Sequence, residues 1–321
     1  MELLLEGTPF LFKEATAQIG NYFKANESFI WDGKHTAQLE HGQAGWWGAQ
    51  GGAANNNRMM MIGCTRADFS SARWSCANSE KQRALRAGVA DYHGDAGPGI
   101  QFLTRLTLLR EVNWDVKTQN LVANPVPELL GLRTGSLASE SIPSLPASPH
   151  VVAKTGGGAA ASADIVIKFS GFTAATKGSF GACVLGNGTS GSGIGITITL
   201  APGQNNPGGV QGVSVASGAC KVGQAAANAG ADHAADSETM QLFDDETELT
   251  VRVLPDRSVA DWFVQGGRWA ATNGWQGTEP RQPQDSSVML WASAAGVTAQ
   301  VDVYGMGCGW LNPSFTDHPS L

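Results

Sequence analysis

The feature that most constrains the fold is a two-residue alternation of apolar, often β-branched, side chains with polar ones. It runs through residues 164–169, 195–200, 248–254 and 297–304. An alternation of this period covers one face of a pleated strand with apolar groups and leaves the other face polar. Clusters of Gly, Asn, Ser and Pro lie between these runs and have the composition of turns. Residues 151–312 are therefore predicted to form an antiparallel β-sandwich.

The remainder of the chain is divided by composition. At about 150 residues per domain, a chain of 321 residues has room for two. Residues 1–133 are also β-like but less regular, and residues 79–90 are the one helix candidate. Residues 134–150 are rich in Ser and Pro and show no period, so they are predicted to form an extended linker. Residues 313–321 are predicted to be a tail, and the expected class is all-β.

Charge and hydropathy exclude several classes of partner. Lys and Arg number 21 against 28 Asp and Glu, so the net charge is −7 and no broad basic surface for nucleic acid or anionic lipid is expected. No window approaches 18 consecutive apolar residues, so no membrane-spanning helix is predicted. An acidic residue at position 2 and the lack of a basic stretch make the N-terminus unlike a signal peptide, which leaves the compartment open.

The five cysteines are widely spaced, and neither a CxxC pair nor a Cys/His pair at zinc spacing is present. No metal site is therefore predicted. Buried free thiols are expected, with one or two disulfides as the alternative. The Gly-rich stretch 186–195 is not followed by Lys-Ser/Thr or by a helix, which is typical of a loop and not of a phosphate-binding turn. No cofactor is indicated.

Three parts of the chain resemble glycoside hydrolase family 32, the invertase and fructan-hydrolase family. Residues 99–108 and 120–133, the latter with Pro-Val-Pro-Glu-Leu, are similar to the segments that close the family's catalytic propeller. Residues 254–268, with Asp-Arg-Ser and Gly-Gly-Arg, look like the Asp-x-Ser and Gly-Gly-Arg segment of its C-terminal sandwich. Residues 42–50 and 57–64 look like two segments of a late propeller blade. The resemblance covers nearly the whole chain in the family's order.

The resemblance implies a fold and a reaction. Members combine a five-bladed β-propeller with a C-terminal antiparallel β-sandwich. They cleave or transfer β-fructosyl groups, as in sucrose and fructans, with retention, using an Asp nucleophile, a second Asp and a Glu acid/base. Retention requires two carboxyl groups about 5 Å apart, one to attack the anomeric carbon and one to protonate the leaving oxygen. Relatives are often extracellular or vacuolar.

The sequence departs from the family at the catalytic motifs. It contains no Asn-Asp-Pro, Arg-Asp-Pro or Glu-Cys-Pro segment, and Glu2 is only a weak candidate for a surviving acid. Residues 1–133 are therefore predicted to be a partial propeller made of late blades. No catalytic residue is assigned, and the chain as given is expected not to hydrolyse sucrose.

The candidate substrate-binding residues are Glu40, Gln43, Trp46 and Trp47. The family segment similar to residues 40–43 contacts the sugar through an Asp, but Glu40 in its place moves the carboxylate by one methylene, which favours a solvated charge at a strand end. Trp46 and Trp47 are adjacent, so on a strand they face opposite sides, and one could stack on a sugar ring while the other packs in the core.

Other charged residues are predicted to be structural. Asp261 takes the place of a family Glu near the propeller–sandwich interface, and Gly266-Gly267-Arg268 is predicted to form a hairpin turn. Arg105 and Arg133 are each expected to pair with a carboxylate such as Glu111 or Glu128.

Three functional hypotheses follow from these observations. The first is a fructoside-acting glycosidase, represented here without its reacting carboxylates. The second is a non-catalytic carbohydrate-binding or structural module, and the third is an unrelated lectin-like sandwich. In the first two the expected partner is a carbohydrate of the sucrose or fructan type, and the oligomeric state is left open.

Overall fold

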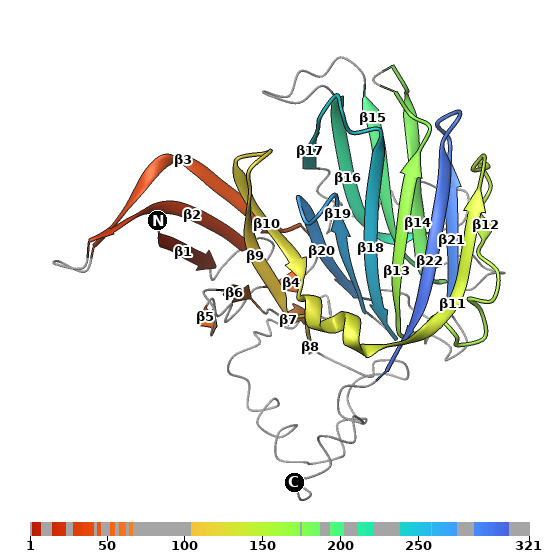
Figure 1. Ribbon diagram of the computed structural model, residues 1–321, viewed down its shortest axis with the longest axis horizontal. Coiled ribbons are helices and arrows are strands. Elements are labelled where there is room, and N and C mark those ends of the chain that lie inside the picture. Colours follow the sequence, from red (N-terminus) through yellow and green to blue (C-terminus); the bar gives the residue numbers. More distant parts are fainter. Residues whose placement is uncertain are drawn as a thin grey trace, which may run out of the picture.

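The computed structural model describes most of the second half of the chain and selected strands of the first (Figure 1). The described residues are 2–7, 15–23, 28–41, 44–45, 52–54, 58–61, 64–66, 104–173, 175–186, 193–201, 211–220, 238–257, 259–274 and 286–307. Their secondary structure is almost entirely β, as predicted, with one short 3₁₀ helix, η1 (Pro127–Leu132). The helix candidate at 79–90 lies outside the described residues.

The second half of the chain forms a sandwich of two six-stranded antiparallel sheets, as its alternation predicts. The first sheet has the order β11 (Arg133–Ile142), β22 (Thr298–Met306), β13 (Ala163–Ser170), β18 (Glu248–Asp256), β19 (Val259–Val264) and β20 (Trp269–Gly274). The second has the order β12 (His150–Val151), β21 (Ser287–Ala292), β14 (Gly178–Gly186), β15 (Gly193–Ala201), β16 (Gln211–Cys220) and β17 (Glu238–Leu242).

The core of the sandwich lies between the two sheets and follows from the alternation. On β13, Ile165, Ile167 and Phe169 are fully buried, whereas Lys168 between them is exposed. Phe169 meets Phe180 of the opposite sheet, with ring centroids 4.7 Å apart. Burial of each such side chain stabilises the fold by roughly 1.5–3 kcal/mol. The core is continuous across both sheets, so the sandwich has the packing of a single domain.

The N-terminal part forms three smaller antiparallel sheets beside the sandwich, as expected for blades of a partial propeller (Figure 1). The first is β1 (Glu2–Gly7), β2 (Ala15–Phe23) and β3 (Ser28–Glu40). The second, in spatial order, is β10 (Asn120–Pro125), β9 (Arg110–Asp115), β6 (Arg58–Met61) and β5 (Gly52–Ala54). The third is β4 (Ala44–Gly45), β7 (Cys64–Arg66) and β8 (Thr104–Leu106). Strands β3 and β10 reach the sandwich at β20.

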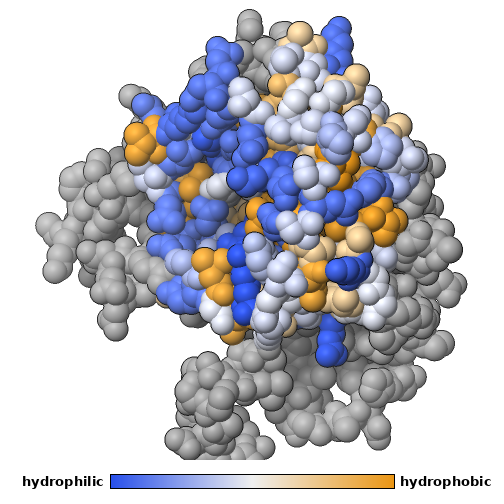
Figure 2. All heavy atoms as spheres, turned by 45° about the vertical axis from the view of Figure 1, so that its right-hand side comes forward, coloured by the Kyte–Doolittle hydropathy of each residue, from blue (hydrophilic) through white to orange (hydrophobic). Residues whose placement is uncertain are grey.

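The prediction of an extended linker at 134–150 is wrong for its first half. Residues up to Ile142 belong to β11, which pairs with β22 along its length. The sequence does not reveal this strand because it is an edge strand with two register shifts in which only Ile142 is buried, so it has no apolar period. Figure 2, which brings this side forward, shows mainly hydrophilic side chains with apolar groups scattered among them.

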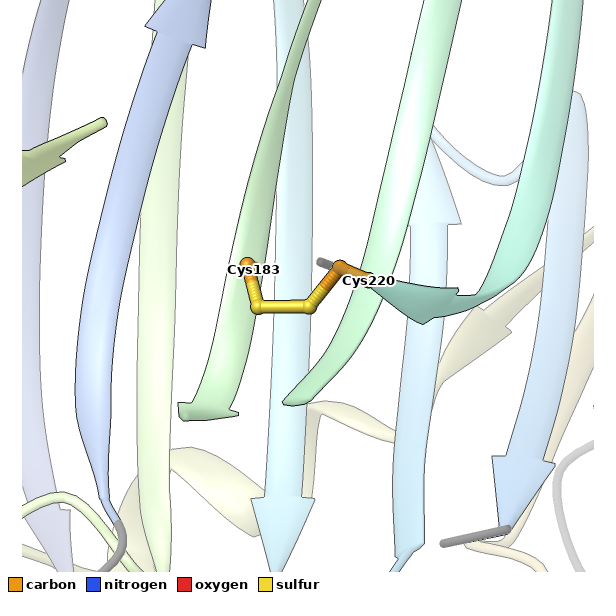
Figure 3. Close-up of a disulfide and its surroundings, with 2 residues drawn as sticks. All are labelled: Cys183 and Cys220. Carbon is orange, nitrogen blue, oxygen red and sulfur yellow. A yellow bond between two sulfur atoms is a disulfide. The ribbon is translucent and has the colours of Figure 1, made fainter. Parts of the chain in front are cut away.

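The expectation of free thiols is wrong for one pair, because Cys183 and Cys220 form a disulfide (Figure 3). It joins β14 to β16 and crosses β15, which lies between them in the sheet. Gly193 and Gly195 of β15 lie beneath it. A Cβ atom at Gly193 would lie 2.6 Å from the Cys183 Sγ, and one at Gly195 would lie 2.7 Å from the Cys220 Cβ. The two glycines therefore provide the room that the crossing needs.

Candidate functional site

The candidate site is the junction at which the N-terminal sheets meet strands β19 and β20 of the sandwich. The turn between these strands spans residues 265–268, as predicted, and Gly266 and Gly267 have φ of 65° and 81°. Backbone hydrogen bonds join the two parts, from Ala123 N–H to the Gly267 carbonyl (3.2 Å) and from His41 N–H to the Ala270 carbonyl (2.9 Å). The junction is therefore held partly by main-chain groups of an edge strand, which would otherwise stay unpaired.

A buried polar cluster forms the centre of the junction. Arg110 on β9 and Glu40 at the end of β3 are both fully buried, and Arg110 Nη2 lies 2.8 Å from Glu40 Oε2. The same Nη2 donates to the hydroxyl of Thr272 on β20 (2.7 Å), and Nη1 donates to the Leu39 carbonyl (3.0 Å). The backbone N–H of Thr272 donates to Glu40 Oε1 (2.7 Å). One arginine thus ties two N-terminal strands to the edge of the sandwich.

Asp261 on β19 is the second carboxylate of this cluster and is 2% exposed. It accepts a hydrogen bond from the Thr272 hydroxyl at 2.6 Å, whereas its contact with Arg110 Nη2 is longer, at 3.3 Å. Burial raises the pKa of Asp261, and the charge of Arg110 and the Thr272 hydroxyl offset this only in part. The predicted place of Asp261, at the interface of the two parts, is confirmed.

A second charged cluster lies at the rim of the junction, around Arg268. Its Nε lies 2.9 Å from Asp115 Oδ2 on β9, and its Nη1 lies 2.8 Å from Glu246 Oε2 in the turn between β17 and β18. Lys117, in the turn between β9 and β10, contacts both Asp245 (2.8 Å) and Glu246 (3.2 Å). These pairs are partly exposed, so each contributes little alone, but together they form a network between the two parts.

The pKa values of the carboxylates at the rim are lowered, whereas the pKa of Asp261 is raised. Burial alone would raise the pKa of Asp115, but hydrogen bonds from the Lys117 N–H, Arg268 and Thr118 outweigh it and hold the pKa below its ordinary value. For Glu246, burial is likewise outweighed by Arg268, the Phe243 N–H and Lys117, and its pKa is lowered. The rim network is therefore made of ionised groups at neutral pH.

A cavity of about 250 Å³ opens beside the rim cluster. It lies between β10 and β17, each of which is the outer strand of its sheet. Its lining is mostly polar and consists of Thr118, Asn120, Leu121, Val122, Thr239, Met240, Gln241 and Arg268. Within the described residues, no group of three or more His, Cys, Asp or Glu side chains is placed to hold a metal ion, and no helix is long and apolar enough to cross a membrane.

Of the residues that the sequence predicts for the site, the structure describes some and leaves others outside the described ranges. Glu40 is not a solvated strand-end charge, since it is fully buried and bonded to Arg110 and Thr272. Gln43, Trp46 and Trp47 lie outside the described residues, and Glu2 begins β1. Arg133 does pair with a carboxylate, but the partner is Asp164 (2.8 Å) and not Glu111 or Glu128. Arg105 lies in β8.

The residue that sequence analysis missed is Arg110, although it organises the junction. It stands directly after an apolar stretch, at the start of a strand whose other positions alternate. A lone Arg beside an apolar run is a usable signal, because an arginine is rarely buried unless a carboxylate pairs with it. The sequence could not name its partners, which are 70 and 151 positions away.

Substitution of Gly267 by Ala should weaken the junction. At its φ of 81° a Cβ atom would lie 2.4 Å from the Ala123 carbonyl oxygen, so strain adds to a collision with the N-terminal part. We expect a loss of about 1–3 kcal/mol in the free energy of unfolding, measured by urea denaturation. Gly266→Ala is the matched control. Gly266 also has a positive φ, 65°, but a Cβ atom added there would meet no atom within 4 Å. Equal losses in both variants would show that the Ala123 contact contributes nothing.

Solved structures with the same fold are enzymes of the invertase and fructan-hydrolase type. The chain matches fructan 1-exohydrolase IIa from Cichorium intybus with a TM-score of 0.66 over 95% of its length, at 14% identity. It matches exo-inulinase from Aspergillus awamori at a TM-score of 0.59 over 96% (13% identity), and the GH32 β-fructofuranosidase of Bombyx mori at 0.54 over 95% (15% identity). The resemblance seen in the sequence is confirmed at the level of the fold, a propeller followed by a sandwich.

The match is to part of each of those proteins. The chain spans 56% of the Cichorium enzyme, 53% of the Aspergillus enzyme and 51% of the Bombyx enzyme. No protein-family profile matches the chain, and no curated protein matches it in sequence.

Proposed function

We propose that the chain belongs to a β-fructoside-binding protein of the glycoside hydrolase family 32 type, and that these 321 residues alone do not hydrolyse sucrose. The observation that carries this proposal is that both parts of the chain align together, over 95% of its length, with a fructan exohydrolase. A structure of that enzyme in complex with 1-kestose matches equally well, with a TM-score of 0.67. Fold alone does not fix chemistry, so the substrate class also relies on the sequence resemblance.

The proposed lack of hydrolysis follows from the chemistry that retention needs. A nucleophilic carboxylate and a proton-donating one must flank the bond. The family's three carboxylate motifs do not occur in the sequence, and the two buried carboxylates at the junction are engaged by Arg110 and Thr272. A carboxylate bonded to an arginine and closed off from solvent cannot reach an anomeric carbon. Glu40 and Asp261 are therefore assigned to the junction and not to catalysis.

Sugar contact is proposed for the segment that directly follows Glu40. Burial of Glu40 fixes the end of β3, and Gln43, Trp46 and Trp47 come three to seven residues later. An amide can hydrogen-bond sugar hydroxyls, and an indole face suits the C–H face of a sugar ring. Since neighbouring residues on a strand face opposite sides, only one of the two tryptophans is expected to stack on the ligand.

The test combines an activity assay with a binding assay on the purified 321-residue chain. We expect no fructose release from sucrose, 1-kestose or inulin above the blank, and measurable binding of 1-kestose by calorimetry. Either Trp46→Ala or Trp47→Ala, but not both, should weaken binding by about threefold to tenfold. Fructose release that disappears in Glu2→Ala or Glu40→Ala would overturn the claim of inactivity. Absence of 1-kestose binding would overturn the proposed fructoside binding and favour the alternative, a structural β-sandwich module.

A further inference from the structure

The cavity of about 250 Å³ between β10 and β17 has an arginine in its wall with hydrogen-bonding capacity to spare. The Arg268 side chain is 10% exposed, its Nε lies 2.9 Å from Asp115, and its Nη1 donates to Glu246 (2.8 Å) and to the Gln241 carbonyl (3.4 Å). Among the described residues, Nη2 has no hydrogen-bond partner. Its two N–H groups are therefore available as donors to a ligand in the cavity.

Two further side chains of the wall hold unused polar groups. Asn120, at the start of β10, accepts the Leu121 backbone N–H with its Oδ1 (2.9 Å), which leaves its amide hydrogens without a partner among the described residues. Thr239 on β17 is exposed, and within the same part of the chain its hydroxyl makes no hydrogen bond. The cavity thus presents donors and a hydroxyl from both facing strands, which fits a ligand that carries several hydroxyl groups.

The remaining wall is apolar and suits the C–H face of a sugar ring. It is formed by Leu121 and Val122 of β10 and Met240 of β17. Trp114 of β9, which is 38% exposed, is the cross-strand partner of Leu121. Directly opposed residues of antiparallel strands lie on the same face, so an indole lies beside this part of the wall. Polar groups next to an apolar and aromatic surface are typical of small-ligand sites.

The charges at the cavity favour a neutral ligand over an anion. The rim cluster contains two cations, Arg268 and Lys117, and three anions, Asp115, Asp245 and Glu246, so it carries one net negative charge. A phosphate or carboxylate that approached Arg268 would also meet these carboxylates, whereas a sugar hydroxyl would not be repelled.

We propose that this cavity is a sugar-binding site for one neutral ring, with Arg268 Nη2, Asn120 Nδ2 and the Thr239 hydroxyl as its hydrogen-bonding groups. Its volume lies just below the range usual for drug-sized ligands, so it suits a single ring. The ring is either a free monosaccharide or one unit of an oligosaccharide, which present the same chemistry. The site is separate from the segment that follows Glu40. The sugar class follows from the cavity, whereas the choice of fructosides as probes rests on the proposed function.

The test removes the sugar contact already proposed and measures what remains. D-fructose and 1-kestose are titrated, with ligand-observed NMR, against the 321-residue chain carrying both Trp46→Ala and Trp47→Ala. We expect this variant to retain binding of 1-kestose at the cavity. Binding of D-fructose as well identifies a free ring as a sufficient ligand, and binding of 1-kestose alone identifies a unit of a chain. Either result supports the proposal, and loss of all binding in this variant would overturn it.

Cavity variants in the same background locate the binding. Thr239→Val removes the hydroxyl and keeps the shape, and Asn120→Asp keeps an oxygen for the Leu121 N–H but removes the amide donor. Each should weaken binding by about threefold to tenfold. Thr247→Val is the matched control, since it is exposed, lies in the turn between β17 and β18, and is not part of the cavity wall. Full affinity in both cavity variants would overturn the site and leave the proposed function of the Trp46–Trp47 segment intact.

The charge argument has its own probe. Fructose 6-phosphate adds an anionic group to the same sugar and should bind at least about threefold more weakly than 1-kestose. Tighter binding of the phosphate would show an anion site on Arg268 and would overturn the proposal. Crystals of the chain soaked in 1-kestose should contain a sugar ring between β10 and β17, and a ring bound only elsewhere would contradict the assignment.

Discussion

Replacement of Arg110 by Met is expected to lower the free energy of unfolding by roughly 3–5 kcal/mol. The side chain is fully buried, and its Nη atoms contact Glu40, Thr272, Asp261 and the Leu39 carbonyl. Met fills much of the same volume but leaves Glu40 buried without this cation. The guanidinium carbon also lies 5.1 Å from the centre of the Phe263 ring, a contact that Met would retain only as packing. Urea denaturation followed by tryptophan fluorescence measures the loss.

The expected loss belongs to the junction, so the two parts should respond differently. Limited proteolysis of Arg110→Met is expected to cut the N-terminal strands first, while residues of the sandwich stay protected. The double variant Arg110→Met, Glu40→Met should recover part of the stability, because replacing both members of a buried pair by apolar groups removes the unpaired charge. Arg133→Met is the control at a partly exposed pair, since Arg133 is 24% exposed and Arg252 also binds its partner Asp164. A loss of less than 1 kcal/mol in Arg110→Met would contradict the central role of this arginine.

The sandwich was predictable because the alternating pattern that specifies each strand lies within the strand itself. The runs at 164–169, 195–200 and 248–254 lie within observed strands, and the run at 297–304 begins one residue before β22, since an alternating face specifies burial without reference to any partner. Strand β11 was not predictable in the same way. Only Ile142 among its residues is buried, and its structure comes from backbone hydrogen bonds to β22, about 160 positions further along the chain. A polar edge strand and a linker look alike in sequence.

The candidate site was only partly predictable, for a related reason. The sequence resemblance placed Asp261 at the interface, and the structure agrees. It could not show that Glu40, a charge at a strand end, is covered by a hairpin more than 200 positions away. Burial of a charge is a property of what packs over it, and no local pattern encodes that cover. The same limit applied to the cysteines, because their pairing depends on the register of β14, β15 and β16.

Removal of the disulfide by Cys183→Ala and Cys220→Ala together is expected to lower the stability of the sandwich by about 4 kcal/mol. The bond closes a loop with a sequence separation of 37, and closure of such a loop removes conformations from the unfolded chain. Both cysteines are buried, 4% and 5% exposed, and pack with Met289. The alanines would therefore also leave unfilled volume, which adds to the loss.

Thermal unfolding with and without a reducing agent separates these two contributions. Reduction should lower the midpoint of the wild type toward that of the double variant and leave the double variant unchanged, with the thiol count checked by alkylation and mass spectrometry. Gly193→Ala offers an independent test from the strand beneath the bond, because its Cβ would lie 2.6 Å from the Cys183 Sγ and 3.1 Å from the Cys220 Sγ. It should destabilise the oxidised wild type more than the double Ala variant, in which the same Cβ no longer meets a sulfur bridge. If fully reduced wild-type chain unfolds at the same temperature as the oxidised chain, the disulfide does not stabilise the sandwich.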